Sequence, residues 1–242
     1  MTGTWINIIT VLFGSALGVL FGPRLPHRVR ETVVAALGLF TLAVGVNLFI
    51  ESVGVEGENP LVPLVSLLVG GILGEWWRIE RRLKSLGTWL EGRFARGSGD
   101  AAEENRFIRG FLSASLLFCV GPMTIIGAMQ DGLTGDYQLL AIKSVLDGFA
   151  SMALASTLGI GVMFSVVVIL AYQGSISLLA AQAQTFFSDI MLAEMTAVGG
   201  VLLLSLSIGA LLDLRPIRSG NLLPALLIAP ILVLGLQTLG MG

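Results

Sequence analysis

Lys143 and Asp147 are four residues apart in the otherwise apolar segment AIKSVLDGFASMALAS. This spacing places both side chains on one face of a helix. A carboxylate in such a setting can bind a cation or carry a proton, while the ammonium group can modulate it or contact an anion. The alternative is an ion pair that neutralises itself and fixes the helix among its neighbours. We include the intervening Ser144 in the candidate binding site.

A second candidate is the segment Cys119-Val120-Gly121-Pro122-Met123-Thr124. Proline removes a backbone donor and clashes with the preceding turn, and the glycine before it loosens the helix further. Broken helices free carbonyl and amide groups, from which many transporters build sites within the membrane. We therefore add Cys119, Gly121, Pro122 and Thr124 to the candidate site. A simple proline kink is the alternative.

The segment Gln130-Asp131-Gly132-Leu133-Thr134-Gly135-Asp136 contains one Asp-Gly and one Gly-Asp pair, which mark tight turns. We expect a loop here whose acidic side chains form a vestibule, with Gln130 and Asp131 contributing to the ion or substrate site. A plain connector is the alternative.

The composition places these candidates in a membrane. Apolar residues make up 55% of the 242 residues and charged residues only 12%, about half of the roughly 25% usual in soluble domains. The mean hydropathy is +0.89. The apolar residues form runs of about 18 or more, long enough to cross roughly 30 Å of hydrocarbon as helices. The sequence predicts an all-α, polytopic transmembrane helix bundle of about eight spans, some broken or kinked.

We treat residues 1–242 as a single integral membrane domain. The helix spans are expected at 4–22, 32–51, 60–76, 107–129, 138–157, 162–181, 190–212 and 222–240. The charges support this division, because all of the 14 lysines and arginines except Lys143 then fall on one side. The positive-inside rule places that side in the cytoplasm, so we expect a multi-pass inner-membrane protein with both termini outside.

Residues 76–106 form the largest basic segment between two spans. Apolar residues recur at steps of three and four, at Trp76, Ile79, Leu83, Leu86 and Leu90. This pattern predicts an amphipathic helix on the cytoplasmic membrane surface, with the tryptophans of the segment at headgroup depth. A polar extension of the third span is the alternative. The tract 97–100 is expected to be a flexible linker.

Small residues recur every fourth position in three of the predicted spans. This spacing lets helix backbones approach closely in lipid, where apolar burial gives little drive for association. Intrachain packing and a homodimer both remain open. The residues are Gly14, Gly18 and Gly22 in the first span, Gly70 and Gly74 in the third, and Ser205 and Gly209 in the seventh.

Several functional classes find no support in the sequence. A glycine-rich phosphate loop with lysine is absent, as are the HExxH and GxSxG motifs. The only cysteine is Cys119 and the only histidine is His27, which is expected in a loop far from it. We therefore predict no enzyme activity, no cofactor, no metal site and no nucleic-acid partner.

Four stretches of the chain resemble a family of bacterial inner-membrane proteins of unknown function, the YdfK/YqgA type. The likeness covers nearly the whole chain, and the motifs CVGPM (119–123) and KSVLDG (143–148) are its most specific parts. It implies a membrane protein, and it implies no substrate. The stretches are FCVGPMTIIGAMQDGLTGDYQLLAIKSVLDG, STLGIGVMFSVVVILAYQG, NLLPALLIAP and GGILGEWWRIE.

Two functions of different classes follow from these observations. The first is a small secondary transporter or channel for an ion or small solute, with its site between the break at Gly121-Pro122 and the face of Lys143 and Asp147. The second is a non-transporting scaffold or regulatory subunit that binds lipid or a partner through the amphipathic helix. In both, the lipid bilayer is the main partner.

Overall fold

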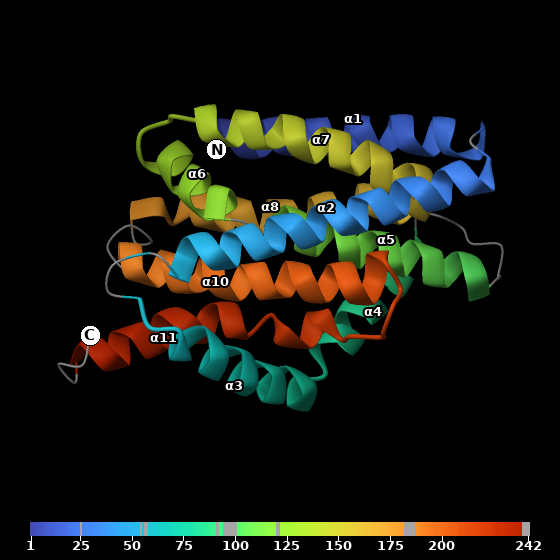
Figure 1. The fold of residues 1–242 in the computed structure, drawn as a ribbon. Helices are drawn as coiled ribbons and strands as arrows, with labels where there is room; N and C mark the ends of the chain where they lie inside the picture. The colour runs from blue at the N-terminus through green and yellow to red at the C-terminus, as the bar shows by residue number, and fades with distance from the viewer. Residues whose placement is uncertain are drawn as a thin grey trace.

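Helices pack side by side into a bundle, roughly along one axis (Figure 1). The computed structural model describes residues 1–24, 26–53, 55, 58–90, 92–93, 101–119, 122–181 and 187–238, and every regular element in these ranges is a helix. The predicted helical membrane bundle is therefore confirmed. The α-helices are α1 (Thr2–Phe21), α2 (His27–Val53), α3 (Leu61–Trp77), α4 (Ile79–Leu90), α5 (Ala101–Cys119), α6 (Pro122–Leu133), α7 (Gln138–Leu158), α8 (Ser165–Leu178), α10 (Asp189–Leu206) and α11 (Ala225–Thr238).

Residues 138–178 form a helical hairpin that accounts for two of the predicted spans. The run is 41 residues long, about twice what is needed to cross the hydrocarbon. It reverses at Gly159, whose φ of +79° suits glycine, and at the 3₁₀ segment Gly159–Phe164. The start of α1 contacts both the start of α7, through Gly3 and Leu140, and the end of α8, where the hydroxyls of Thr4 and Ser177 are 3.5 Å apart. The helices α7 and α8 are therefore antiparallel.

Two bent pairs of helices, α3–α4 and α5–α6, are each long and apolar enough together to form one further span. Five helical runs are long and apolar enough to cross a membrane, or seven if each bent pair is one span. With the α7–α8 hairpin counted as two, the bundle agrees with the eight predicted spans. The span expected at 107–129 is not one kinked helix, because α5 and α6 meet at an angle of 62°. The helices α3 and α4 meet at 53° around Arg78, which has a left-handed backbone (φ 52°).

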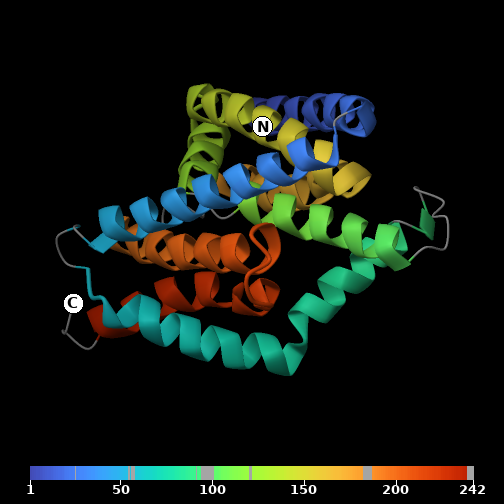
Figure 2. The ribbon, with the colours of Figure 1, turned by 45° about the vertical axis from the view of Figure 1, so that its right-hand side comes forward.

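The helix α4 turns from α3 toward α5 (Figure 2). Only part of the apolar face that the sequence predicts is buried. Leu90 is buried in a cluster with Phe107 and Phe111, and Gly87 lies against Phe111 of α5. Leu86 is exposed instead. The apolar stripe of α4 is thus divided between the bundle and its surroundings. The predicted linker 97–100 lies outside the described residues.

The predicted small-residue faces lie within the chain. A Cβ on Gly18 would stand 2.8 Å from Cβ of Ala155, so α1 and α7 touch along their backbones. Gly14 faces Ser151 in the same interface. Gly70 and Gly74 of α3 face Ala225 and Asn221, Gly22 faces Ser156, and Gly209 faces Ile217 of the next loop. Ser205 hydrogen-bonds to Ser219 at 2.8 Å.

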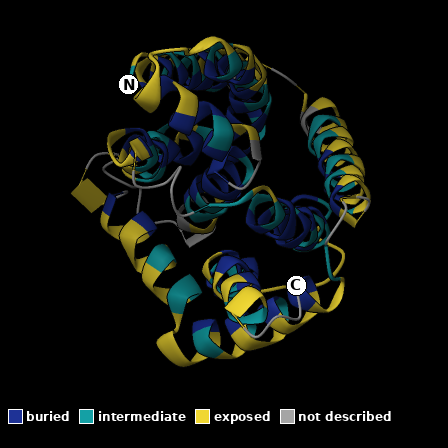
Figure 3. Cartoon of the chain, turned by 90° about the vertical axis from the view of Figure 1, so that its left-hand side faces the viewer, coloured by how far each residue is buried: buried dark blue, intermediate teal, exposed yellow. Residues whose placement is uncertain are grey.

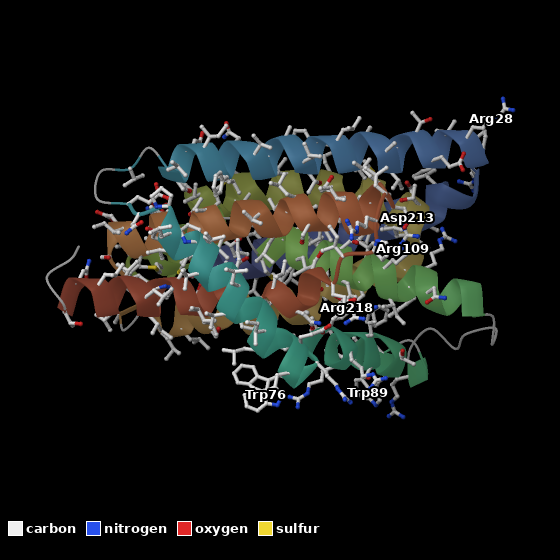
Figure 4. All side chains as sticks on the ribbon, turned by 60° about the horizontal axis from the view of Figure 1, so that its bottom comes forward. Arg28, Trp76, Trp89, Arg109, Asp213 and Arg218 are labelled. Atoms are coloured by element: carbon white, nitrogen blue, oxygen red, sulfur yellow. The ribbon has the colours of Figure 1, made fainter. Side chains whose placement is uncertain are left out.

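The two ends of the bundle carry opposite charges. We call one the basic end; Arg28, Arg109 and Arg218 lie toward it (Figure 4). We call the other the acidic end; it carries the chain start, Asp131 and the loop at Asp136. Between the ends, exposed residues line the outside of the bundle and buried residues its inside (Figure 3). Many large apolar side chains on the outside are exposed, as suits a lipid environment. Five of them are 66–68% exposed, namely Phe13, Phe40, Ile72, Phe149 and Leu227.

Candidate functional site

Lys143 and Asp147 form a buried ion pair near the middle of α7. The ammonium donates to Oδ2 of Asp147, and the two residues are only 6% and 8% exposed. Burying two charges is costly unless each is paired and hydrogen-bonded. Here the α-helix itself supplies the pairing, since the residues are one turn apart on one face.

Further buried polar side chains extend from this pair across three helices. Asn7 of α1 lies beside Asp147, and its Nδ2 donates to Oε1 of Gln173 in α8 at 3.1 Å. Nε2 of Gln173 donates to Oγ1 of Thr4 at 3.2 Å. Ser177, next to Thr4, donates to the carbonyl of Ala128 in α6 at 3.0 Å. We call this set, with Lys143 and Asp147, the polar chain.

The polar chain leads from mid-bundle toward the acidic end. Asn7 and Thr4 lie in the first two turns of α1, and Gln173 and Ser177 in the last two turns of α8. Asn7, Thr4 and Gln173 are fully buried and Ser177 is 4% exposed. A row of groups that donate and accept hydrogen bonds thus runs through an otherwise apolar interior.

Cys119 lies near the Lys143–Asp147 pair, on the side nearer the basic end. It is the last residue of α5, it is buried, and it lies close enough to Lys143 and Asp147 for both charges to act on its sulfur. The structure therefore places Cys119 in the same region of the interior as the α7 pair. Nearby, the Thr124 hydroxyl donates to the carbonyl of Phe118 at 3.0 Å and so satisfies one carbonyl freed by the break. Gly121 and the Pro122 side chain lie outside the described residues.

A narrow cavity approaches Cys119 from the basic end. It has a volume of about 150 Å³, and Leu83 of α4 and Tyr172 of α8 are among its lining residues. Its walls are nearly all apolar. Ser115, one of its few polar residues, has a buried hydroxyl without a hydrogen-bond partner. This cavity and the polar chain meet the candidate site from opposite directions.

The structure corrects the expected placement of Asp131. It lies in the last turn of α6, not in a loop, and its side chain is fully buried. Oδ2 accepts from the backbone N–H of Gly3 and from the Met1 ammonium, both at 3.1 Å. Asp131 therefore holds the start of α1 and cannot line an open vestibule. Gln130 is exposed on α6.

Ser144 also lies apart from the polar chain. Its hydroxyl donates to the Leu140 carbonyl one turn earlier, at 2.6 Å. The residue borders an apolar groove of about 330 Å³ between α1 and α7. Its side chain therefore satisfies the backbone of α7 and contributes no free group to Asp147.

Sequence reasoning missed most of the polar chain. Asn7, Thr4, Gln173 and Ser177 were not among the predicted site residues. A detectable signal exists: Thr4 and Asn7 are three residues apart, and Gln173 and Ser177 four apart, so each pair shares a helix face. Their convergence across more than 160 residues requires the fold.

A pair of acidic residues occupies the acidic end. Glu194 of α10 is 1% exposed, and its Oε1 accepts from the backbone N–H of Asn59 at 2.9 Å. Oε2 of Glu194 and both carboxyl oxygens of Glu58 are buried without hydrogen-bond partners. Burial raises the pKa of the Glu58 carboxyl above its usual value. In the described part of the chain, no cation is paired with either residue.

A larger cavity of about 660 Å³ opens at the basic end. The arginines in its wall are engaged with backbone carbonyls. Nη2 of Arg109 donates to Ala210 and Nε of Arg106 to Thr157, both at 2.7 Å. Arg109 also lies 3.5 Å from Asp213 (Figure 4). These contacts cap the ends of helices, so the cavity offers little uncompensated charge.

Comparison with known proteins gives a consistent assignment. The family model "Protein of unknown function (DUF554)" matches residues 2–234. The chain is 31% identical over 241 residues to "Uncharacterized membrane protein YdfK" of Bacillus subtilis (strain 168), covering 100% of this chain and 99% of that protein. It is 33% identical over 227 residues to "Uncharacterized protein YqgA" of Escherichia coli (strain K12), covering 94% of each. No solved structure matches. The chain is thus a membrane protein, and it belongs to the DUF554 family of proteins of unknown function.

Proposed function

We propose that this membrane protein is a small secondary transporter or channel for an ion or small solute, and not an enzyme. The observation that carries the proposal is the buried Lys143–Asp147 pair, which lies beside the α5–α6 break and continues into the polar chain. Ionisable residues at such a depth are costly, and they commonly mark ion and substrate pathways.

The surroundings of the pair support a route with two sides. On the acidic side, the oxygens of Asn7, Gln173 and Thr4 can replace water around a small cation. On the basic side, the cavity at Cys119 brings space close to the same pair. In this proposal Asp147 is the cation ligand or proton carrier. Lys143 tunes it, because the ammonium competes with the transported cation for the carboxylate.

The proposal includes a membrane orientation. The basic end faces the cytoplasm of a bacterial inner membrane, and both termini face outward, because cytoplasmic loops are enriched in lysine and arginine. It does not include a homodimer. The glycines that suggested one, such as Gly14, Gly18 and Gly70, pack against other helices of the same chain.

A ligand screen on the purified protein tests the proposal. Thermal unfolding in detergent would be followed with Na⁺, K⁺, changes in pH, common anions, amino acids and small organic acids. A ligand that binds the folded state raises stability by about 2.7 kcal/mol at about 100 times its Kd. We expect at least one to stabilise the wild type and to lose its effect in Asp147→Asn.

Asp136→Asn is the matched control, since it makes the same chemical change at an exposed residue of the α6–α7 loop. It should respond to the ligand as the wild type does. Flux of that ligand into liposomes should then fail with Asp147→Asn only. Flux that Asp147→Asn carries at the wild-type rate would refute a transport site at this pair.

The scaffold function remains a second candidate, because Trp76 and Trp89 are 78% and 61% exposed near the basic end. The scaffold function predicts the opposite effects of substitution at the tryptophans and at Asp147. Replacing Trp76, Trp77 and Trp89 with Ser would abolish function, and Asp147→Asn would preserve it.

A further inference from the structure

The bend between α3 and α4 forms a charged pocket at the basic end. Its volume is about 440 Å³. We call it the headgroup pocket. It is lined by four basic side chains, Arg78, Arg81, Lys84 and Arg218, and by the acids Glu75 and Glu80. The left-handed backbone of Arg78 makes the bend, so this one residue both shapes the pocket and lines it.

The pocket carries uncompensated positive charge. Glu75 is bound by Arg218 and by Asn221, and Glu80 lies 2.8 Å from Lys84. Both acids are therefore engaged. Arg78 and Arg81 have no acidic partner within the described residues, which leaves two of the four positive charges unbalanced. Two guanidinium groups with free N–H donors suit the oxygens of a phosphate group.

The position of the headgroup pocket indicates which molecule would supply the phosphate group. Trp76 precedes the bend and Trp89 lies in the last turn of α4, and both project from the same side of the bundle (Figure 4). Tryptophan is enriched at the boundary between hydrocarbon and water. Apolar residues of α3, such as Ile72 and Leu68, are exposed toward lipid just before the bend. The pocket therefore lies where lipid headgroups lie.

We propose that the headgroup pocket binds the phosphate of an anionic phospholipid in the leaflet at the basic end. Arg78 and Arg81 donate to the phosphate oxygens, while the pocket's excess positive charge favours a lipid with net negative charge over a zwitterionic one. Trp76 and Trp89 lie beside the acyl chains and hold α4 at the interface. This inference is independent of transport through the bundle.

Quenching of tryptophan fluorescence by brominated lipids measures the preference of the headgroup pocket for anionic over zwitterionic phospholipid. The full chain, with Trp5 and Trp77 replaced by Phe, would be placed in phosphatidylcholine vesicles containing a minor fraction of brominated phosphatidylglycerol. A parallel sample would contain the same fraction of brominated phosphatidylcholine. We expect stronger quenching by the anionic lipid. A basic residue near the surface contributes about 1 kcal/mol to anionic-lipid binding, so Arg81→Gln should lower the relative affinity about fivefold.

Arg82→Gln is the matched control. It removes the same charge from the next residue of α4, which is exposed and does not line the pocket. It should change the preference much less than Arg81→Gln. Equal losses in the two variants would mean general attraction to a basic surface and would overturn the pocket. Wild-type thermal stability of both variants in neutral detergent would show that each is folded.

A second measurement separates lipid from free phosphate. Thermal unfolding in neutral detergent would be followed with a short-chain phosphatidylglycerol and with inorganic phosphate. Stabilisation by the lipid alone, absent in Arg78→Gln/Arg81→Gln, supports the proposal. Equal stabilisation by inorganic phosphate would identify a soluble anion as the ligand and overturn it, as would no stabilisation by either.

Discussion

Asp147 and Lys143 are each other's counter-ion in the described interior. Removing one partner of a buried pair leaves an unpaired charge and costs about 3–5 kcal/mol. Replacing both with apolar residues of similar size is often close to neutral. We therefore expect Lys143→Met to lower the free energy of unfolding by about 3 kcal/mol, and Lys143→Met/Asp147→Leu to recover most of it, in denaturant titrations in detergent.

The same double variant separates structure from transport. If the pair were only structural, the recovered protein would also recover its ligand response. Our proposal requires a stable protein that no longer binds the ligand. A double variant no more stable than Lys143→Met would contradict the coupling, because the two losses would then be independent.

Glu58 gives the protein a predictable response to pH. Burial raises its folded-state pKa above the ordinary value of 4.5. The folded protein then keeps a proton that the unfolded chain has released, so stability falls as pH rises from about 4.5 through the raised value. Glu58→Gln keeps a neutral side chain at every pH. It should be more stable than the wild type above that value and equal to it below 4.5.

Thermal unfolding over a pH series checks this prediction. Glu51→Gln is the control, since it makes the same chemical change at an exposed residue near the end of α2. Glu194 of α10 is the carboxylate that faces Glu58, so Glu58→Gln/Glu194→Gln should flatten the profile further. An identical slope in Glu58→Gln and the wild type would contradict the buried placement of Glu58.

The parallel pair α1–α7 positions the polar chain, and its spacing depends on glycine. A Cβ on Gly18 would meet the Met152 carbonyl and the Cβ of Ala155. Overpacking of this kind typically costs about 1–3 kcal/mol. We expect Gly18→Ala to destabilise the protein by that amount and to weaken the ligand response by moving Asn7 away from Asp147.

Gly235→Ala is the matched control for this change. Gly235 also lies within a helix, α11, but a Cβ there would meet nothing within 4 Å. Alanine should therefore be tolerated or slightly stabilising, because glycine costs about 0.5–1 kcal/mol in a helix. Thermal unfolding of the two variants in detergent gives the comparison. Equal effects at both positions would contradict the close approach of α1 to α7.

The helices themselves were largely predictable, and their contacts only in part. Apolar runs and Gly159 mark the α7–α8 hairpin, and Gly121-Pro122 marks the division between α5 and α6. Both features depend on residues that are close together in the sequence, so they can be predicted without the fold. The burial of Asp131 is different, since it depends on an amide 128 residues away. A Gly-rich acidic segment resembles a loop until that partner is known.

The candidate site, too, could be predicted only where it does not depend on contacts between distant helices. Lys143 and Asp147 stand out because charge is rare in apolar helices. Gln173 and Thr4 do not stand out, because neutral polar residues also occur as ordinary helix contacts in membranes. Their role depends on three helices meeting at one depth, and periodicity within one helix carries no information on which helices are neighbours.

The predicted eight passes and the proposed orientation lead to one prediction about the whole molecule. In a Cys119→Ser background, single cysteines would be placed at Asp136, at Ser85 and at Asp213, which are all exposed. Intact spheroplasts would be treated with a membrane-impermeant maleimide. We expect Asp136→Cys to react fully, and Ser85→Cys and Asp213→Cys to react only after lysis, because the basic end should face the cytoplasm.

The pattern of labelling also tests the broken pair α5–α6. Ser85 and Asp136 are separated in sequence by this pair alone, and its halves meet at 62°. If the pair crosses the membrane, the two cysteines react from opposite sides. If the pair enters and returns, the two cysteines react from the same side. That result would contradict the placement of α4 and of the Asp136 loop at opposite ends of the bundle, and with it the route by which a cation would reach Asp147 through the polar chain.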